Sequence, residues 1–456
     1  MNGTQKYKTD IPVAKIFIYS GDYYLYDTYN NHLLQISKEH YIELSILFKQ
    51  GINEYLCSCR RTQPYKDIVS LMYRGYLRKP WIEHIEHPET LIVESIISRG
   101  MQHLTLQVTQ DCNFKCRYCH YTRDTSIERT HNKTQMDWEV AKKSIDFMWE
   151  HSKDSSQICF GFYGGEPLLN FNLIRECTEY IEKKFETKNI SCNITTNGSV
   201  LTNEIIKYMA EKNFTVSVSL DGPPHIQNYN RKFYENGKDT FDVVWNNVQR
   251  MKEVNLEWFN KKVYFHPVYL AHENATEIMK FYSTNSISPK KVLLYRANLD
   301  GIDYISINTE VQLPNEKNEI ANPIFRDFEK QFKSKSIINN RWHHNGPCVP
   351  GGRKIFVDVN GNIFPCEKLN SSMANSIGDI DNGINIDIVK KLMNIGKMTE
   401  AQCKRCFAMR FCSICVQKCY NPEKGCIDLE QKEEQCNKIK NKAINQLKQY
   451  IERNKK

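Results

Sequence analysis

The sequence lacks any long hydrophobic run. Across its 456 residues, no apolar stretch approaches the roughly 18 residues that a membrane-spanning helix requires. The first ten residues, MNGTQKYKTD, also lack the apolar core of a secretory signal. With 40% hydrophobic and 25% charged residues, the composition is that of an ordinary globular protein. We therefore expect a cytoplasmic protein with no membrane partner.

A basic stripe interleaved with aromatic residues is also lacking. The formal net charge is +9, but residues 437–456 hold seven basic residues and one acidic residue, and so carry +6 of it. The rest of the chain is close to neutral. A solvated basic C-terminal helix explains this excess, so we expect no nucleic-acid partner.

Cysteine, in contrast, is abundant. The chain has 17 cysteines, and without an export signal they argue against a disulfide framework, because the cytosol keeps thiols reduced. Ten of the 17 fall into two groups, at residues 112–119 and 403–436. This clustering predicts that most of them bind metal.

Residues 1–97 have the pattern of a separate module. The runs KIFIYS and YYLYDT flank a Gly-Asp pair and predict a hairpin, followed by the apolar run LLQIS. Apolar residues at three-to-four spacing predict helices over residues 39–50 and 65–76. Strands followed by helices in so short a segment indicate a winged-helix-like fold. An inert N-terminal cap is the alternative.

Residues 98–300 alternate apolar strand-like runs with helical spacing, which predicts a parallel sheet wrapped by helices. Six such units form an α/β fold, a partial (β/α)6 TIM barrel, in which chemistry gathers at the C-terminal ends of the strands. The expected strands cover residues 103–110, 158–165, 191–198, 214–222, 262–270 and 291–299. A polar bridging segment (301–345), a cysteine-rich domain (346–440) and a basic C-terminal helix (441–456) are expected to follow.

Three cysteines stand directly after the first expected strand, in the run QDCNFKCRYCHY. Cys112, Cys116 and Cys119 have CxxxCxxC spacing. A [4Fe–4S] cluster normally takes four thiolates, so a compact run of three leaves one iron open to a small molecule. A zinc knuckle that lacks one ligand is the other interpretation, but no fourth ligand stands at zinc-like spacing nearby.

This pattern resembles the signature of the radical S-adenosylmethionine (SAM) enzymes. In that family, the amino and carboxylate groups of SAM chelate the open iron, and electron transfer then cleaves SAM to a 5′-deoxyadenosyl radical. The resemblance implies SAM contacts at the ends of the successive strands. The residues that it selects are Tyr118, Gly164, Gly165, Glu166, Thr196, Asn197, Ser219, Asp221 and Arg231. We expect the two glycines to let the backbone approach the ligand and Glu166 to accept from its ammonium group. We expect Asp221 to suit a ribose hydroxyl and Arg231 to pair with the SAM carboxylate.

The C-terminal cysteines resemble the SPASM extension of radical SAM enzymes, which houses two auxiliary [4Fe–4S] clusters. The resemblance therefore implies three [4Fe–4S] clusters in all. It assigns an outer cluster to Cys403, Cys406, Cys412 and Cys436, and an inner cluster to Cys348, Cys366 and either Cys415 or Cys419. The spacing departs from the family pattern at Val416, where a cysteine is expected, and Cys426 competes with Cys436. A zinc ribbon at the two CxxC pairs is the alternative.

Glu367 follows Cys366 directly and is our candidate catalytic base. In the similar sulfatase-maturing enzymes an Asp at that place removes a substrate proton. A simple salt-bridge role for Glu367 is the other interpretation.

The whole pattern most resembles maturases that cross-link cysteine sulfur to carbon in ribosomally made, cysteine-rich peptides. That resemblance implies a precursor peptide whose leader binds the N-terminal module, and an electron donor such as flavodoxin or ferredoxin. A sulfatase-maturing formylglycine synthase is the second interpretation. A non-catalytic iron–sulfur or zinc protein is the third.

Overall fold

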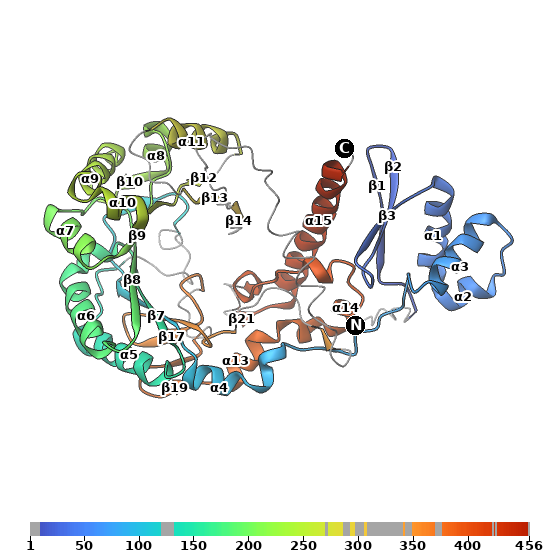
Figure 1. Ribbon diagram of the computed structural model, residues 1–456, viewed down its shortest axis with the longest axis horizontal. Coiled ribbons are helices and arrows are strands. Elements are labelled where there is room, and N and C mark those ends of the chain that lie inside the picture. The colour runs from blue at the N-terminus through green and yellow to red at the C-terminus, as the bar shows by residue number, and fades with distance from the viewer. Residues whose placement is uncertain are drawn as a thin grey trace.

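The computed structural model describes residues 10–119, 132–269, 272–285, 292–296, 305–307, 341–342, 349–369, 376–421, 424 and 426–454. The described elements form a curved barrel wall, a C-terminal region beside its opening, and a small N-terminal module beyond that region (Figure 1). Among the described helices, none combines the length and the apolar character of a membrane span.

The N-terminal module is a three-stranded antiparallel sheet packed against helices. Ser20 and Gly21 both have positive φ (50° and 81°), as the tight turn of the predicted hairpin requires. Leu25, Leu44 and Tyr55 are buried between sheet and helices. The hairpin is confirmed, whereas the winged-helix class stays a prediction. The elements are β1 (Ala14–Tyr19), β2 (Asp22–Asp27), β3 (His32–Ile36), α1 (Lys38–Gln50), α2 (Ile52–Cys57) and α3 (Gln63–Tyr73).

The barrel wall is one mixed sheet of nine strands in the order β11-β9-β8-β7-β5-β16-β17-β18-β19. Its first five strands are parallel, as the alternating sequence predicts. They are β5 (His103–Thr109), β7 (Gln157–Gly164), β8 (Asn189–Thr196), β9 (Thr215–Val218) and β11 (Val263–Phe265).

Helices cover the outer face of this sheet, as Figure 1 shows. Alternate residues of β5 join the apolar core under them, among them Leu104 and Leu106, while His103 and Thr105 occupy the other face of the strand. The barrel helices are α5 (Trp138–His151), α6 (Phe171–Lys184), α7 (Asn203–Glu211), α8 (Pro224–Asn230), α9 (Phe241–Val254), α10 (Leu256–Lys262) and α11 (His272–Thr284), with α4 (Val93–Arg99) preceding β5.

The predicted count of six units is not confirmed. The run expected as one strand over 262–270 divides into β11 and β12 (Val268–Tyr269), and β12 lies in a separate three-stranded sheet with β13 (Leu294–Arg296) and β14 (Ile305–Ile307). A parallel bridge between Phe265 and Val292 links this sheet to the barrel wall. The expected 301–345 bridging segment lies largely outside the described residues.

The C-terminal region continues the barrel sheet. β16 (Lys354–Val357) pairs in parallel with β5, placing Lys354 opposite His103. The antiparallel strands β17 (Asn362–Phe364), β18 (Gly378–Asp379) and β19 (Gly383–Ile384) follow. The sequence did not predict this addition, because parallel pairing between segments about 250 residues apart leaves no local pattern.

The remaining C-terminal elements are α13 (Ile386–Met393), α14 (Glu400–Cys403), β20 (Tyr420–Asn421), β21 (Cys426–Ile427) and α15 (Leu429–Asn454). The last helix is longer than the predicted 441–456, and one of its faces is buried at Ala443, Leu447 and Ile451. Two short strands, β4 (His84–Ile85) and β15 (Arg341–Trp342), also pair.

The N-terminal module docks on the C-terminal region. Phe17 and Tyr24 of its sheet share an apolar cluster with Leu447 of α15. Buried Arg410 donates from Nε to the carbonyl oxygen of Thr28 at 2.5 Å and from Nη2 to that of Tyr29 at 2.7 Å. A guanidinium fixed by two carbonyl groups gives this contact a defined geometry.

Replacing Arg410 by Ala is expected to loosen this docking by about 2–4 kcal/mol, because two carbonyl groups lose a charged donor. Limited proteolysis should cut between the module and the barrel faster, and the thermal midpoint should fall. Exposed Arg61 provides the control, since Arg61→Ala should change neither. If Arg410→Ala were cleaved at the wild-type rate and melted at the wild-type temperature, this role of Arg410 would be contradicted.

Candidate active site

The three-cysteine loop follows β5 and is closed by a short ribbon. β6 (Phe114–Cys116) pairs antiparallel with β10 (Arg231–Phe233), so that Cys116 lies opposite Arg231. Cys116 is buried, whereas Cys112 and Cys119 are half-buried. The structure thus brings the loop to the C-terminal end of β5, where the sequence predicted chemistry. The last two residues of the motif run, 120–121, lie outside the described residues.

Burial raises the pKa of the Cys116 thiol to about 12 and that of Cys112 well above its usual range. Both would remain neutral at pH 7 unless a positive charge compensated the thiolates. A bound metal supplies such a charge and deprotonates its thiol ligands. The donor set therefore fits a metal cluster. In the described ranges, no three His, Cys, Asp or Glu side chains are arranged to hold a single metal ion.

Gly164 and Gly165 bring the end of β7 against the cysteine loop. Gly165 N donates to Thr109 O at 3.0 Å, and Glu166 N donates to Asp111 O at 2.8 Å. A Cβ on Gly164 or Gly165 would overlap the carbonyl oxygen of Thr109 or Asp111, respectively. We expected these glycines to admit a ligand. The approach seen here is between two backbone segments, and their contact with SAM stays a prediction.

Glu166 is fully buried beside the loop. It accepts from Thr196 Oγ1 at 2.7 Å and from Asn197 N at 2.6 Å. Burial raises the pKa of Glu166 to about 7, against the lowering effect of these hydrogen bonds. Such a carboxylate suits an ammonium ligand, which would restore the balance of charge. The structure thus brings together Glu166, Thr196 and Asn197 as the sequence predicted.

Asn113 connects this group to the cysteines, although no motif in the sequence had singled it out. Its Oδ1 accepts from Asn197 Nδ2 at 2.8 Å, and its own Nδ2 donates to Ser199 Oγ at 2.8 Å. Asn197 Nδ2 also lies 4.0 Å from Cys112 Sγ. The position of Asn113 directly after Cys112 was the available signal.

Asp221, Tyr118 and Arg231 form a second buried group. Tyr118 donates from its hydroxyl to Asp221 Oδ2 at 2.6 Å, and Arg231 Nε lies 3.2 Å from the same oxygen. Val268 N donates to Asp221 Oδ1 at 3.0 Å. We expected Asp221 to suit a ribose hydroxyl. In this structure, its carboxylate is fully buried and binds protein donors.

Arg231 reaches the cysteine loop from this group. Its Nη1 lies 3.7 Å from Cys116 Sγ, and its guanidinium lies 5.2 Å from the centre of the Tyr118 ring. We expected Arg231 to pair with the SAM carboxylate, which stays a prediction. Ser219 contributes through its backbone, since its N–H donates to Thr196 O at 2.8 Å and joins the ends of two strands.

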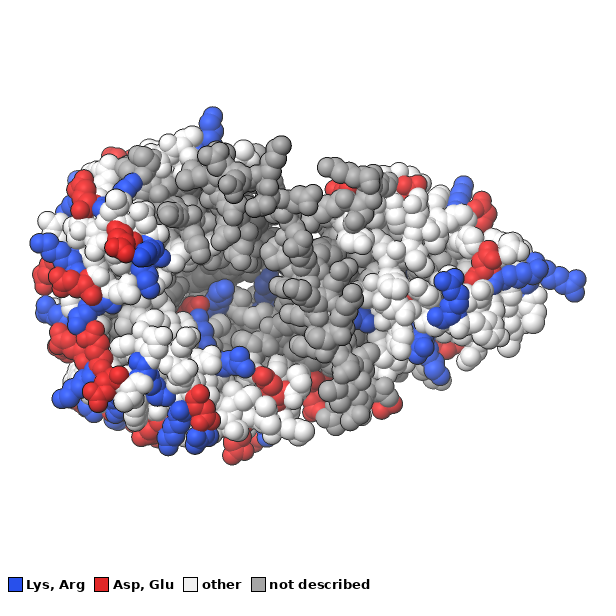
Figure 2. Space-filling model, in the orientation of Figure 1, with Lys and Arg blue, Asp and Glu red and all other residues white. Residues whose placement is uncertain are grey.

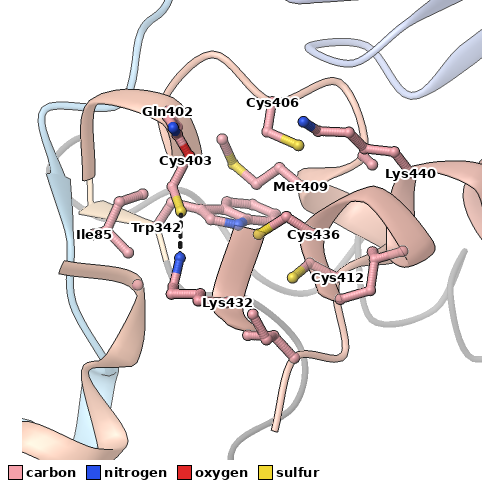
Figure 3. Close-up of a pocket in the computed structure, with 14 residues that line it drawn as sticks. Ile85, Trp342, Gln402, Cys403, Cys406, Met409, Cys412, Lys432, Cys436 and Lys440 are labelled. Carbon is pink, nitrogen blue, oxygen red and sulfur yellow. Dashed lines mark hydrogen bonds between the residues drawn. The ribbon is translucent and has the colours of Figure 1, made fainter. Parts of the chain in front are cut away.

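Four C-terminal cysteines line one pocket, which encloses about 580 Å³ with the solvent at its mouth included. Figure 3 shows their sulfur atoms around it, together with Lys432 and Lys440. The four are those that the sequence assigned to the outer cluster: Cys403, Cys406, Cys412 and Cys436.

Lys432 gives this pocket a buried positive charge. Its side chain comes from α15, the residue is 1% exposed, and Nζ contacts Thr399 Oγ1 and lies 4.0 Å from Cys403 Sγ. Buried charges require compensation. A metal centre with four thiolate ligands carries net negative charge and provides it, so these residues fit such a group. No motif in the sequence had singled out Lys432. It lies one helical turn before Cys436 in α15, and this spacing was the available signal.

The inner cysteine set is only partly described, because Cys348 lies outside the described residues. Burial raises the pKa of Cys366, and the charge of Cys415 adds to this rise. Cys419 is fully buried, and the charges that act on it include those of Lys432, Cys436 and Cys415. The choice between Cys415 and Cys419 as a ligand of the inner cluster stays a prediction.

Glu367 forms a half-buried ion pair with a lysine that the sequence analysis missed. Lys354 Nζ lies 2.7 Å from Glu367 Oε2. Burial alone would raise the pKa of Glu367, but Lys354 outweighs it and holds the pKa below its usual range. His103 lies opposite Lys354 in the sheet. Burial, and to a lesser extent the positive charge of Lys354, lowers the pKa of His103 to about 4.

Comparison with known proteins places this geometry in a family. Residues 106–284 match the family described as the Radical SAM superfamily. This part of the chain is a radical SAM domain. The matched region spans β5 to α11 and contains the three-cysteine loop, Glu166 and Asp221. The domain implies SAM and a [4Fe–4S] cluster as cofactors.

Similarity to individual proteins reaches beyond the radical SAM domain and covers most of the chain. The radical SAM cyclopropyl synthase TigE of Paramaledivibacter caminithermalis is 22% identical over 374 residues, 75% of each chain. A cysteine-type anaerobic sulfatase-maturating enzyme of Clostridium novyi is 24% identical over 349 residues, 67% of this chain and 88% of that one. The solved structure of native anSMEcpe with bound AdoMet covers 77% of this chain and 100% of its own, with a TM-score of 0.53 and 19% identity. This last likeness shows a shared fold.

The raised pKa of Glu166 makes a prediction for stability. An acid whose pKa rises from 4.5 unfolded to about 7 folded stabilises the fold most below pH 4.5, and this contribution is lost as the pH rises through 7. The difference is about 3 kcal/mol. In the cluster-free protein, the melting temperature of Glu166→Gln minus that of the wild type should therefore increase from pH 5 to pH 8. Exposed Glu204→Gln should give a flat difference. If the melting temperatures of Glu166→Gln and the wild type differed by the same amount at every pH, the raised pKa of Glu166 would be contradicted.

Lys432 makes a prediction for the outer cysteine pocket. Lys432→Gln removes a buried positive charge, so an iron–sulfur cluster bound there should become harder to reduce, by on the order of tens of millivolts. A potentiometric titration monitored by electron paramagnetic resonance measures this shift. Lys438→Gln on the same helix is the control, because Lys438 is about half exposed and pairs with Glu434. An unchanged reduction potential in Lys432→Gln would contradict the proposal that Lys432 acts on a cluster bound in this pocket.

Proposed function

We propose that this protein modifies a ribosomally made, cysteine-rich peptide and forms cross-links between cysteine sulfur and carbon. The observation that carries the proposal is the combination of a three-cysteine loop in the radical SAM domain with a separate four-cysteine pocket in the same chain. When bound, SAM and the first cluster supply a 5′-deoxyadenosyl radical that removes hydrogen from a substrate carbon.

Several residues have distinct parts in this proposal. Cys112, Cys116 and Cys119 hold the first cluster, and Glu166 orients the SAM amino group. Glu367, kept ionised by Lys354, receives a substrate proton. The C-terminal cysteines hold two auxiliary clusters, the outer one at Cys403, Cys406, Cys412 and Cys436 and the inner one at Cys348, Cys366 and either Cys415 or Cys419.

A peptide substrate is supported by the N-terminal module, which lies outside the matched radical SAM region. Its sheet has the order β1-β2-β3, so β1 and β3 are its two edges. A leader peptide that adds a strand to such an edge needs only main-chain hydrogen bonds and pockets for alternate side chains. Among the described residues on the face in Figure 2, charged side chains of both signs are interspersed and form no basic stripe.

A second function, sulfatase maturation, is favoured by the match to the Clostridium novyi enzyme and by the fold shared with anSMEcpe. The two functions differ in product. Thioether formation removes two hydrogen atoms from the peptide and retains sulfur, whereas formylglycine formation from cysteine removes the sulfur. Mass spectrometry of a cysteine-rich peptide encoded next to this gene, and of a sulfatase peptide, distinguishes them.

Replacing Cys112, Cys116 and Cys119 together by Ala tests the radical step. After anaerobic reconstitution and reduction with dithionite, the variant should form no 5′-deoxyadenosine but keep the absorbance of the auxiliary clusters. Cys57→Ala/Cys59→Ala, in the N-terminal module, is the control and should retain SAM cleavage. Loss of all iron from the triple variant would contradict our ligand assignment. A wild-type protein with intact clusters that cleaves no SAM would refute the enzyme itself.

A further inference from the structure

The ribbon of β6 and β10 carries Cys116 of the cysteine loop on its buried face. Along β6 and the turn that follows it burial alternates, because Phe114, Cys116 and Tyr118 are buried whereas Lys115 and Arg117 are exposed. This is the period of two that a β-strand imposes. The same short strand therefore carries a cluster ligand on its inner face and positive charge on its outer face.

The second strand repeats the pattern. Arg231 is buried, Lys232 is partly exposed, and Tyr234, just beyond the strand, is 61% exposed. Lys115 and Lys232 stand directly opposite one another. Like charges in that position destabilise a strand pair. Lys232 is partly compensated by its ion pair with Asp239.

Exposed aromatic rings complete the outer face. Tyr229, at the end of α8, is 61% exposed, and the Arg117 guanidinium lies 4.1 Å from the centre of its ring. Around the ribbon and its turn, the exposed and partly exposed cations outnumber the acids. The cations are Lys115, Arg117, Lys232 and Lys238, and the acids are Glu235 and Asp239. Large exposed aromatic groups beside arginine are typical of protein-binding surfaces.

We infer that this outer face, which we term the basic ribbon, docks an acidic one-electron donor protein of the flavodoxin or ferredoxin class. The inference rests on the proposed function, which requires one electron for each SAM cleaved. That electron leaves the reduced cofactor of the donor and enters the first cluster, and no proton or covalent bond is exchanged in this step.

Position and charge both support this partner. Lys115 and Arg117 directly precede and follow Cys116 in the chain, so a protein bound at their exposed side chains lies close to this cluster ligand. Positive charge around such a surface steers an acidic partner and orients it. A polynucleotide would also find charge and aromatic rings here, but nothing in its chemistry needs the proximity of Cys116.

Charge reversal tests the docking. We would compare the wild type, Lys115→Glu/Arg117→Glu, the milder Lys115→Gln/Arg117→Gln, and Lys153→Glu/Lys207→Glu as a control at exposed lysines elsewhere on the barrel. All are full-length, reconstituted proteins. The rate at which the first cluster is reduced is measured once with reduced flavodoxin and once with dithionite. Electron paramagnetic resonance follows this cluster, which is recognised because its signal changes when SAM is added.

We expect the reversed ribbon to lower the flavodoxin rate by roughly ten-fold or more at low salt, with a smaller loss for the neutral variant. The control should keep the wild-type rate, and added salt should slow the wild type toward the reversed variant. Reduction by dithionite should be unchanged in every variant.

Two results would overturn the inference. If flavodoxin reduced the cluster of Lys115→Glu/Arg117→Glu as fast as that of the wild type, the basic ribbon would not be the docking site. The same conclusion would hold if this variant had lost binding to single-stranded RNA, because the face would then serve RNA instead. An equal loss with flavodoxin and dithionite would show damage to the cluster instead. Because cluster reduction is measured directly, these results do not depend on whether a peptide is modified.

Discussion

The candidate active site depends on the close approach of two backbone segments, the end of β7 and the loop after β5. Hydrogen bonds from Gly165 to Thr109 and from Glu166 to Asp111 hold them together. Only glycine permits this distance, because a Cβ at Gly165 would overlap the Asp111 carbonyl group. The approach fixes Glu166 beside Cys112 and keeps it out of water. The raised pKa of Glu166 and the affinity that we propose for an ammonium group both follow from that burial.

Two buried charges mark the sites that we assign to bound groups. Glu166 lies beside the three-cysteine loop, and Lys432 lies beside the four-cysteine pocket. An isolated carboxylate or ammonium inside a protein is costly unless a partner of opposite charge meets it. SAM carries a positive charge, and a metal centre with four thiolates carries a negative one. The sign of each buried charge thus agrees with the group proposed for its site.

Local patterns in the sequence predicted much of this arrangement. The parallel strands of the barrel wall, the convergence of Glu166, Thr196 and Asn197, and the outer cysteine set follow from strand-end motifs and cysteine spacing. The partners of charged residues did not follow. Lys354 is next to Glu367 in space because β16 joins β5, and a sequence does not reveal such distant pairing. Asp221 was expected at a ribose, whereas the fold surrounds its carboxylate with Tyr118, Arg231 and Val268.

The central claim is that the three-cysteine loop holds a cluster with one iron open to SAM. Electron–nuclear double resonance on the reduced protein, with SAM labelled by ¹⁵N at its amino group, tests it most directly. The account predicts a ¹⁵N coupling to the cluster that disappears when Cys112, Cys116 and Cys119 are replaced by Ala. A wild-type protein with its clusters intact and SAM bound, but without that coupling, would contradict it.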